Sequence, residues 1–179
     1  QESILVSHFL SGQQSNEWNI PLAMWFLGNY SVDRLRQSLV EIARRHSSLR
    51  MTFHPLVDGT FGQKLHDELP RDFFSTCDVG TRDEAIARGE DEARLPMGIT
   101  AGVWKVLLSR VSSQEAALTM VVHHAAFDGG SLAVLFKELQ SVYSRLEAGE
   151  DVRVDADDAN LLHFVDFADW QRRMQRYHQ

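Results

Sequence analysis

The sequence predicts a single mixed α/β domain. Helical and strand patterns alternate along the 179 residues, which is typical of the α/β class or of a mixed sandwich. This length suits one well-packed domain and is too short for two. Apolar residues make up 44% of the composition and charged residues 24%, as in ordinary globular proteins. The sequence contains no internal repeat that would favour a repetitive architecture.

The first third of the chain predicts a strand, a helix and a hairpin, in that order. Residues 19–28 form an apolar run that we expect to be a buried strand. Ser31 is a candidate helix N-cap, and apolar residues recur after it at helical spacing. Residues 50–55 and 61–65 predict two strands that pair across the turn Asp58-Gly59. The apolar face of the expected helix consists of Val32, Leu35, Leu39 and Ile42.

A second helix is predicted over residues 82–94. Thr81, followed three residues later by Glu84, is the signature of a capping box, in which each residue satisfies a backbone N–H of the other. Gly89 lies inside this segment and weakens the predicted helix.

Two strands and a long helix follow. Residues 102–111 and 116–122 are strand candidates joined by the polar turn 112–114. The turn at 128–131 starts a helix with apolar residues at spacings of mostly three and four. The apolar stripe consists of Leu132, Leu135, Phe136, Leu139, Val142 and Leu146.

The last part of the chain predicts a loop and a final helix. Residues 147–160 are acidic and read as a surface loop, and residues 161–177 read as a helix. We expect Trp170 of this helix to pack against the core.

Composition excludes several classes of function. The net charge of −7 repels a phosphate backbone, so we expect no nucleic-acid partner. No apolar stretch reaches the ~20 residues of a membrane span, so we expect no membrane partner. Neither a Gly-rich phosphate loop nor a metal-ligand spacing occurs. Cys77 is the single cysteine, and Asp78 beside it disfavours a reactive thiolate. Without a visible secretory leader, these features favour a cytoplasmic location.

The segment around His123 and His124 is the candidate for chemistry. The pair follows an apolar strand pattern, and successive strand residues face opposite sides. Histidine is the usual general base near neutral pH. Asp128 could orient an imidazole, cap the following helix or pair with an arginine. The N–H groups of Gly129 and Gly130 would lie at a helix N-terminus, where they could stabilise an oxyanion. This combination suits acyl transfer, although two core histidines and a simple helix cap would give the same pattern.

Four segments in order resemble the condensation domains of nonribosomal peptide synthetases. Residues 123–131, HHAAFDGGS, resemble the HHxxxDG motif of that family. Residues 19–28, NIPLAMWFLG, are similar to its early strand, and residues 45–53, RHSSLRMTF, to its RHExLRTxF motif. Residues 164–171, FVDFADWQ, resemble YxDYAxWQ. The first family motif, SxAQxRLW, is only faintly echoed at residues 11–18.

The resemblance implies a fold and a domain boundary. The expected fold is the chloramphenicol-acetyltransferase-like two-layer α/β sandwich, as one lobe of the condensation-domain pseudodimer. Residues 1–179 would form the N-terminal lobe, so the C-terminal lobe of the same domain is an expected partner.

The resemblance also implies roles for individual residues. His124 would be the catalytic histidine, and Gly129 would direct its N–H toward the thioester carbonyl. His123 would be structural. Asp128 would form a salt bridge to Arg50, with Arg45 as the second choice. Breaking such a buried pair would cost roughly 3–5 kcal/mol.

The implied reaction is amide formation between an acyl or peptidyl thioester on a carrier protein and an acceptor amine. No metal or organic cofactor is implied, because the phosphopantetheine arm belongs to the carrier protein. An isolated lobe would have little or no turnover. An ester-forming or CoA-dependent acyltransferase and a non-catalytic carrier-binding domain are the alternatives. Both histidines are present, which disfavours heterocyclisation, whereas epimerisation domains share the motif.

Overall fold

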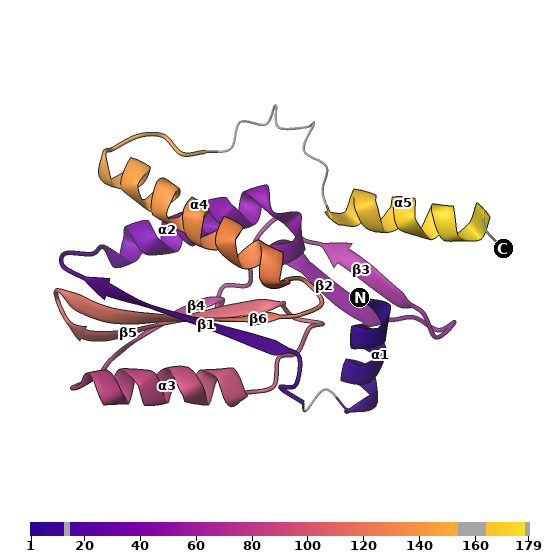
Figure 1. The fold of residues 1–179 in the computed structure, drawn as a ribbon, viewed down its shortest axis with the longest axis horizontal. Coiled ribbons are helices and arrows are strands. Elements are labelled where there is room, and N and C mark those ends of the chain that lie inside the picture. Colours follow the sequence, from indigo (N-terminus) through magenta and orange to yellow (C-terminus); the bar gives the residue numbers. More distant parts are fainter. Residues whose placement is uncertain (13–14, 154–163, 178–179) are drawn as a thin grey trace.

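The computed structural model describes residues 1–12, 15–153 and 164–177 (Figure 1). The helices are α1 (Glu2–Leu10), α2 (Val32–Arg45), η1 (Ser47–Arg50, a 3-10 helix), α3 (Arg82–Arg94), α4 (Gly129–Glu147) and α5 (Phe164–Tyr177). The strands are β1 (Asn19–Leu27), β2 (Met51–Pro55), β3 (Phe61–Leu65), β4 (Phe74–Asp78), β5 (Trp104–Ser112) and β6 (Glu115–His123).

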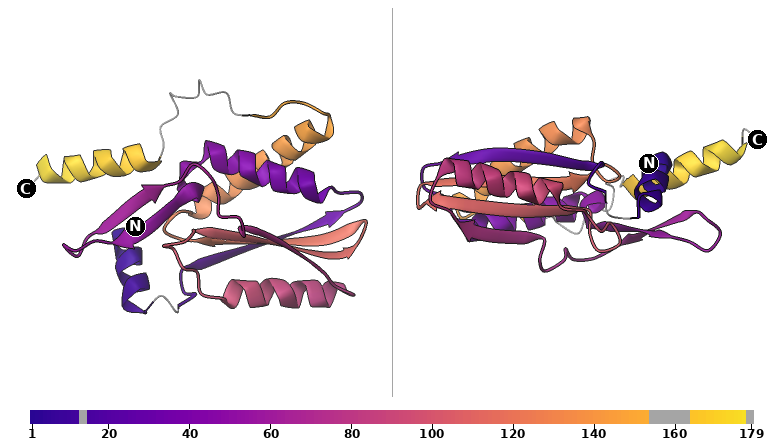
Figure 2. Two further views of the ribbon diagram at one scale, coloured as in Figure 1. Left: turned by 180° about the vertical axis from the view of Figure 1, so that it is seen from behind. Right: turned by 90° about the horizontal axis from the view of Figure 1, so that it is seen from below.

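The centre of the fold is a four-stranded sheet in the order β1-β6-β5-β4. Its neighbours are antiparallel except for the parallel pair β4 and β5. Strands β2 and β3 form a separate antiparallel ribbon. Helices α2 and α4 cover one face of the sheet and α3 covers the other (Figures 1 and 2). The predicted α/β class is therefore confirmed, and α3 adds a layer to the expected two.

Strand β6 lies inside this sheet and is buried along almost its whole length. Its even-numbered residues, such as Leu118 and Val122, pack into the core cluster shared with α2 and α4. Its odd-numbered residues face the opposite layer, where Thr119 meets Gly89 of α3 and Val121 joins a cluster with Leu5 of α1. The face to which a residue of β6 points thus decides which helices it contacts.

The predicted helix starts are confirmed. The Ser31 side chain accepts a hydrogen bond from the Arg34 N–H, and Thr81 accepts one from the Glu84 N–H. The box at Thr81 is only half formed, because the Glu84 carboxylate accepts from the Gly80 N–H at 2.7 Å. The hairpin across Asp58-Gly59 also forms as predicted.

The expectation that residues 19–28 form a buried strand is wrong in its burial. Strand β1 lies at one end of the sheet order, and of its residues only Leu22 is fully buried. Pro21 within the run agrees with this position, because proline cannot donate a ladder hydrogen bond and is confined to edges. Helix α1 and the polar edge strand β4 were not predicted, since neither shows a clear period of apolar residues.

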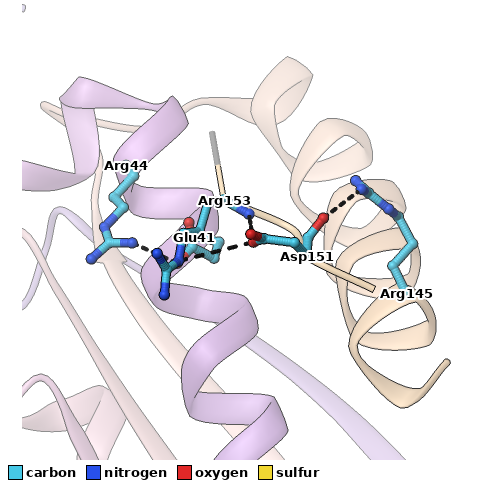
Figure 3. Close-up of polar contacts among 5 residues, drawn as sticks. All are labelled: Glu41, Arg44, Arg145, Asp151 and Arg153. Carbon is cyan, nitrogen blue, oxygen red and sulfur yellow. Dashed lines mark hydrogen bonds and ion pairs between the residues drawn. The ribbon is translucent and has the colours of Figure 1, made fainter. Parts of the chain in front are cut away.

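Residues 150–153 are tied to the helices above the sheet, in contrast to the expected surface loop. Val152 is 1% exposed and belongs to the main core cluster. The Arg145 guanidinium donates to the Asp151 carbonyl at 3.0 Å, and Asp151 in turn accepts from the Arg153 N–H (Figure 3). The remainder of the predicted loop, from residue 154, lies outside the described residues.

Helix α5 does not show the core packing expected of Trp170. Trp170 is 56% exposed and Phe167 is 51% exposed. The centroids of their two rings lie 5.8 Å apart. In Figure 1 the helix extends away from the sheet layers. Phe167 and Trp170 therefore remain on the surface of the described chain. The predicted start of this helix, residues 161–163, lies outside the described residues.

Candidate active site

His123 is the last residue of β6 and is 1% exposed. Its Nδ1 accepts a hydrogen bond from the Ala125 N–H at 3.1 Å, so Nδ1 carries no proton. Its Nε2 lies 3.2 Å from Nδ1 of His8 in α1. In a neutral ring the proton then resides on Nε2 and is donated to His8. These contacts define the His123 tautomer from both sides.

Burial keeps His123 neutral. Desolvation lowers the pKa of His123 from 6.5 to about 4, and the nearby charges of protonated His8 and His124 act in the same direction. Desolvation also lowers the pKa of His8, which is fully buried. Two neutral imidazoles can share one N–H···N hydrogen bond, whereas two cations at this distance would repel each other.

His124 lies on the opposite side and is exposed. Its backbone N–H continues the pairing past the end of β6 by donating to the Trp18 carbonyl at 2.8 Å. The Trp18 ring stands edge-on to the imidazole, with centroids 6.2 Å apart. One histidine of the pair is thus buried and the other is exposed, as the alternation of a strand predicts.

Asp128 begins helix α4 as its N-cap. Its Oδ1 accepts hydrogen bonds from the Ser131 hydroxyl at 2.7 Å and the Ser131 N–H at 2.9 Å. These two bonds, with weaker help from the Gly130 N–H and the charge of His124, hold the pKa of Asp128 below its ordinary value. The carboxylate is therefore charged at neutral pH.

Gly129 is the first residue of α4 and is exposed. A Cβ added to it would meet no heavy atom within 4 Å, so the space above its backbone is open. Its N–H has no acceptor in the described part of the chain and stands at the positive end of the helix dipole. An incoming carbonyl oxygen could accept from this N–H.

The expected salt bridge between Asp128 and Arg50 is wrong. The Arg50 guanidinium donates to the carbonyls of Ala43, Arg44 and His66 instead. The last carbonyls of α2 lack partners within the helix, and a cation suits the negative end of its dipole. Arg45, the second choice, makes no ion pair with Asp128 either.

A different residue of the same motif joins α2 to α4. His46 Nε2 lies 3.0 Å from Glu138 Oε2. Beside this pair a cavity of about 170 Å³ separates the two helices, with Phe127 and Ser131 of segment 123–131 in its wall. The motif thus contacts α4 through His46, whereas Arg50 binds carbonyls at the end of α2 and at His66, and neither residue reaches Asp128.

Sequence reasoning missed three residues that contact the histidine segment. They are Gln1 at the N-cap of α1, His8 within α1 and Trp18 before β1. A histidine within the apolar run of residues 4–10 was the available signal for His8. Nothing local in the sequence indicates its partner, which is 115 positions away.

Other kinds of site find no support in residues 1–12, 15–153 and 164–177. No group of three or more His, Cys, Asp or Glu residues there could hold a metal ion. No helix among them is both long and apolar enough to span a membrane. Cys77 lies on the edge strand β4, with its Sγ 3.4 Å from the Ser109 hydroxyl.

The chain is similar to nonribosomal synthetases from fungi and bacteria. It is 30% identical over 159 residues to beauvericin nonribosomal cyclodepsipeptide synthetase from Beauveria bassiana, covering 87% of this chain and 5% of that protein. It is 31% identical over 169 residues to a linear gramicidin synthase from Brevibacillus parabrevis, covering 89% of this chain and 3% of that protein. The chain thus spans only a small part of these relatives.

Solved structures show the same fold. The X-domain in its complex with OxyB from teicoplanin biosynthesis superposes with a TM-score of 0.83 at 26% identity, over 98% of this chain and 38% of that one. The starter condensation domain of rhizomide synthetase RzmA gives a TM-score of 0.81 at 18% identity, over 97% and 42%. The family model for the condensation domain matches residues 1–179, and the chain therefore belongs to the condensation-domain family.

Proposed function

We propose that residues 1–179 are the N-terminal lobe of a condensation domain that forms amide bonds in a nonribosomal peptide synthetase. The observation that carries this proposal is the exposed His124 beside the open N-terminus of α4, in a chain of this family. The donor is an acyl or peptidyl thioester on a carrier protein, and the acceptor is an amine.

In the proposed reaction the acceptor nitrogen attacks the thioester carbonyl carbon. The C–N bond forms, the C–S bond breaks, and the nitrogen loses a proton to the His124 imidazole. The thiolate leaves with the carrier's arm and takes up a proton to become a free thiol. The exposure of His124 supports its role as base, whereas the buried and neutral His123 cannot reach a substrate.

Two groups assist His124 in this scheme. The Gly129 N–H donates to the carbonyl oxygen as negative charge develops there. Asp128 caps the first turn of α4 and so holds the Gly129 N–H in place.

The partners follow from the chemistry. The phosphopantetheine arm is a substrate tether supplied by the carrier protein, and this lobe supplies no cofactor of its own. The C-terminal lobe of the same domain is a further partner, because the chain covers about 40% of the solved relatives.

The test is the His124→Ala substitution in the intact synthetase that contains this chain. Donor and acceptor carriers are loaded with the synthetase's own amino acids, and the dipeptide is measured by mass spectrometry. We expect the rate to fall by about 10²- to 10⁴-fold, the usual contribution of a general base. His54→Ala, a histidine on β2 outside the site, serves as the matched control. Full activity of His124→Ala contradicts the mechanism.

Ester formation is the first alternative, since the relatives include cyclodepsipeptide synthetases, whose products contain ester as well as amide bonds. An acceptor carrier loaded with an amino acid or with the matching 2-hydroxy acid separates the two reactions. Faster capture of the hydroxy acid would favour ester formation. Use of an acyl-CoA donor in place of the carrier would favour a CoA-dependent enzyme.

A non-catalytic docking role is the second alternative. It is favoured by the similarity to the X-domain, whose structure was solved in complex with another protein, OxyB. Binding of a loaded carrier without any product in the intact synthetase would support this role over catalysis.

A further inference from the structure

Helix α1 and its N-cap residue Gln1 each contact segment 123–131 with one side chain. His8 contacts His123 from one side, with Nδ1 3.2 Å from Nε2. Gln1 donates its amide N–H to the Ala125 carbonyl at 2.6 Å. Each contact joins two residues that lie more than a hundred positions apart in the chain.

The hydrogen bonds fix which nitrogen of each imidazole carries the proton. The Ala125 N–H donates to Nδ1 of His123, so the ring proton of His123 is on Nε2. His8 accepts that proton at its Nδ1 and therefore carries its own proton on Nε2. That second N–H is buried and has no partner among the described residues.

An unpartnered N–H makes His8 a poor choice for stability alone. The residue is fully buried, and an apolar side chain of similar shape would avoid the cost of desolvating a polar group. Such local conflicts are expected at functional positions. What a histidine supplies here and an aliphatic side chain cannot is the acceptor for His123.

The anchored backbone carries His124. His123 holds the N–H of the peptide between His124 and Ala125, and Gln1 holds the carbonyl of the next peptide. Gln63 of β3 donates to Gln1 Oε1 at 2.8 Å and so orients its amide. The direction of the His124 side chain depends on these two peptides.

We propose that helix α1 positions the catalytic loop, with His8 fixing the tautomer of His123 and Gln1 anchoring the Ala125 carbonyl. His8 and Gln1 are positioning residues that act on His124 through the backbone. This inference rests on the proposed role of His124. It adds that His8 and Gln1 set the orientation of His124.

A matched pair of substitutions tests His8. Asn places its Oδ1 the same number of bonds from Cα as the histidine Nδ1, and Leu places a methyl group there. In the intact synthetase we expect His8→Leu to lower kcat by about ten- to a hundredfold with KM unchanged, as for a slightly misplaced catalytic group. His8→Asn should retain a kcat close to that of the parent. Leu10→Ala on the exposed side of α1 is the control for the helix itself.

Nitrogen NMR of the histidine-labelled protein reads the tautomer directly. We expect the shifts of His123 to report Nε2–H in the parent and in His8→Asn, and a mixture of tautomers in His8→Leu. Unchanged His123 shifts in His8→Leu overturn the inference, whatever the activity shows. Equal losses of kcat in His8→Leu and His8→Asn also overturn it, because a volume effect would treat both alike.

The Gln1→Glu variant keeps the proposal testable if His8 variants fail to fold. Gln1 is exposed, and glutamate keeps the acceptor for Gln63 but loses the donor to Ala125. We expect a lower kcat with an unchanged unfolding temperature, and a full kcat contradicts the role of Gln1. Full activity of His124→Ala would refute the proposed function instead, and the NMR result would still decide whether His8 controls His123.

Discussion

His123 and His124 are neighbours in the chain with opposite environments. The strand alternation of β6 turns one ring toward α1 and the other toward solvent. The sequence alone therefore indicated that His123 and His124 face opposite sides of the sheet. The partner of the buried ring could not be assigned from the sequence, because His8 lies on a helix that the sequence pattern does not predict.

Stability should depend on pH through the buried pair. The folded-state pKa of His123 is about 4, against an ordinary value of 6.5 in the unfolded chain. Between these values the unfolded chain binds more protons, so folding stability is full above pH 6.5 and declines toward pH 4. The total loss from His123 is about 3 kcal/mol. The lowered pKa of His8 acts in the same direction.

Urea unfolding of the protein at a series of pH values between 7 and 4 measures this loss. His123→Gln cannot titrate, so its unfolding free energy should decline less steeply over the same interval. Parallel curves for the two proteins would show that His123 is not held neutral by burial.

At the level of elements, Asp128 shows how a motif residue can have a local role. The sequence left open a helix cap, an oriented imidazole and an arginine pair, and the resemblance favoured the pair with Arg50. The structure shows the cap. The reason is distance along the backbone, since Ser131 is always near, whereas Arg50 satisfies carbonyls at the end of α2.

Removing this cap should cost little stability. We expect Asp128→Ala to lower the free energy of unfolding by about 0.5–2 kcal/mol, the usual range for an N-cap, rather than the larger cost of breaking a buried ion pair. Asp128→Asn retains a capping oxygen and should remain close to the parent. Chemical denaturation measures both variants. A loss above the cap range in Asp128→Asn would indicate a partner for the charge itself.

Gly89 has a tertiary reason that the helix pattern does not reveal. A Cβ at this position would lie 2.5 Å from the Thr119 hydroxyl oxygen of β6. Helix α3 can therefore approach the sheet closely only with glycine there. The sequence indicated a weak point in the helix, and the structure identifies it as the point of contact.

Gly89→Ala should destabilise the protein despite the better helix propensity of alanine. Overpacking costs about 1–3 kcal/mol and the propensity returns up to about 1 kcal/mol, so a net loss of about 1 kcal/mol is expected in denaturant unfolding. Adding Thr119→Ala should recover part of this loss. Arg88→Ala on the exposed face is the control, and a stabilised Gly89→Ala would contradict the close contact.

At the scale of the whole molecule, the proposed site is open to solvent. His124, Gly129 and the exposed face of α5 are open in the described chain, and solved relatives are more than twice as long. The sequence predicted core packing for Trp170, because an aromatic residue at helical spacing usually faces a core. Its exposure shows that the core it would pack against is not formed by the described residues.

Residues 1–179 alone should therefore have little or no condensation activity. With loaded carriers, we expect no dipeptide above the uncatalysed background, since a substrate held by one wall gains little of the orientation that accelerates the reaction. Adding the segment that follows in the parent protein should restore turnover. Robust activity of a monomeric preparation would contradict a site formed by two lobes, and light scattering establishes whether the preparation is monomeric.

The sequence by itself determined most of the local elements, with α1 and β4 as exceptions, and the family. Helix starts at Ser31, Thr81 and Asp128, the β2–β3 hairpin and the histidine motif follow from interactions within a few residues, which the sequence records directly. Only the tertiary structure decided the edge position of β1, the close approach at Gly89, the separation of Asp128 from Arg50 and the contact of His8 with His123. Those depend on which surfaces meet after the chain has folded, and contacts between distant residues leave no period or spacing in a single sequence.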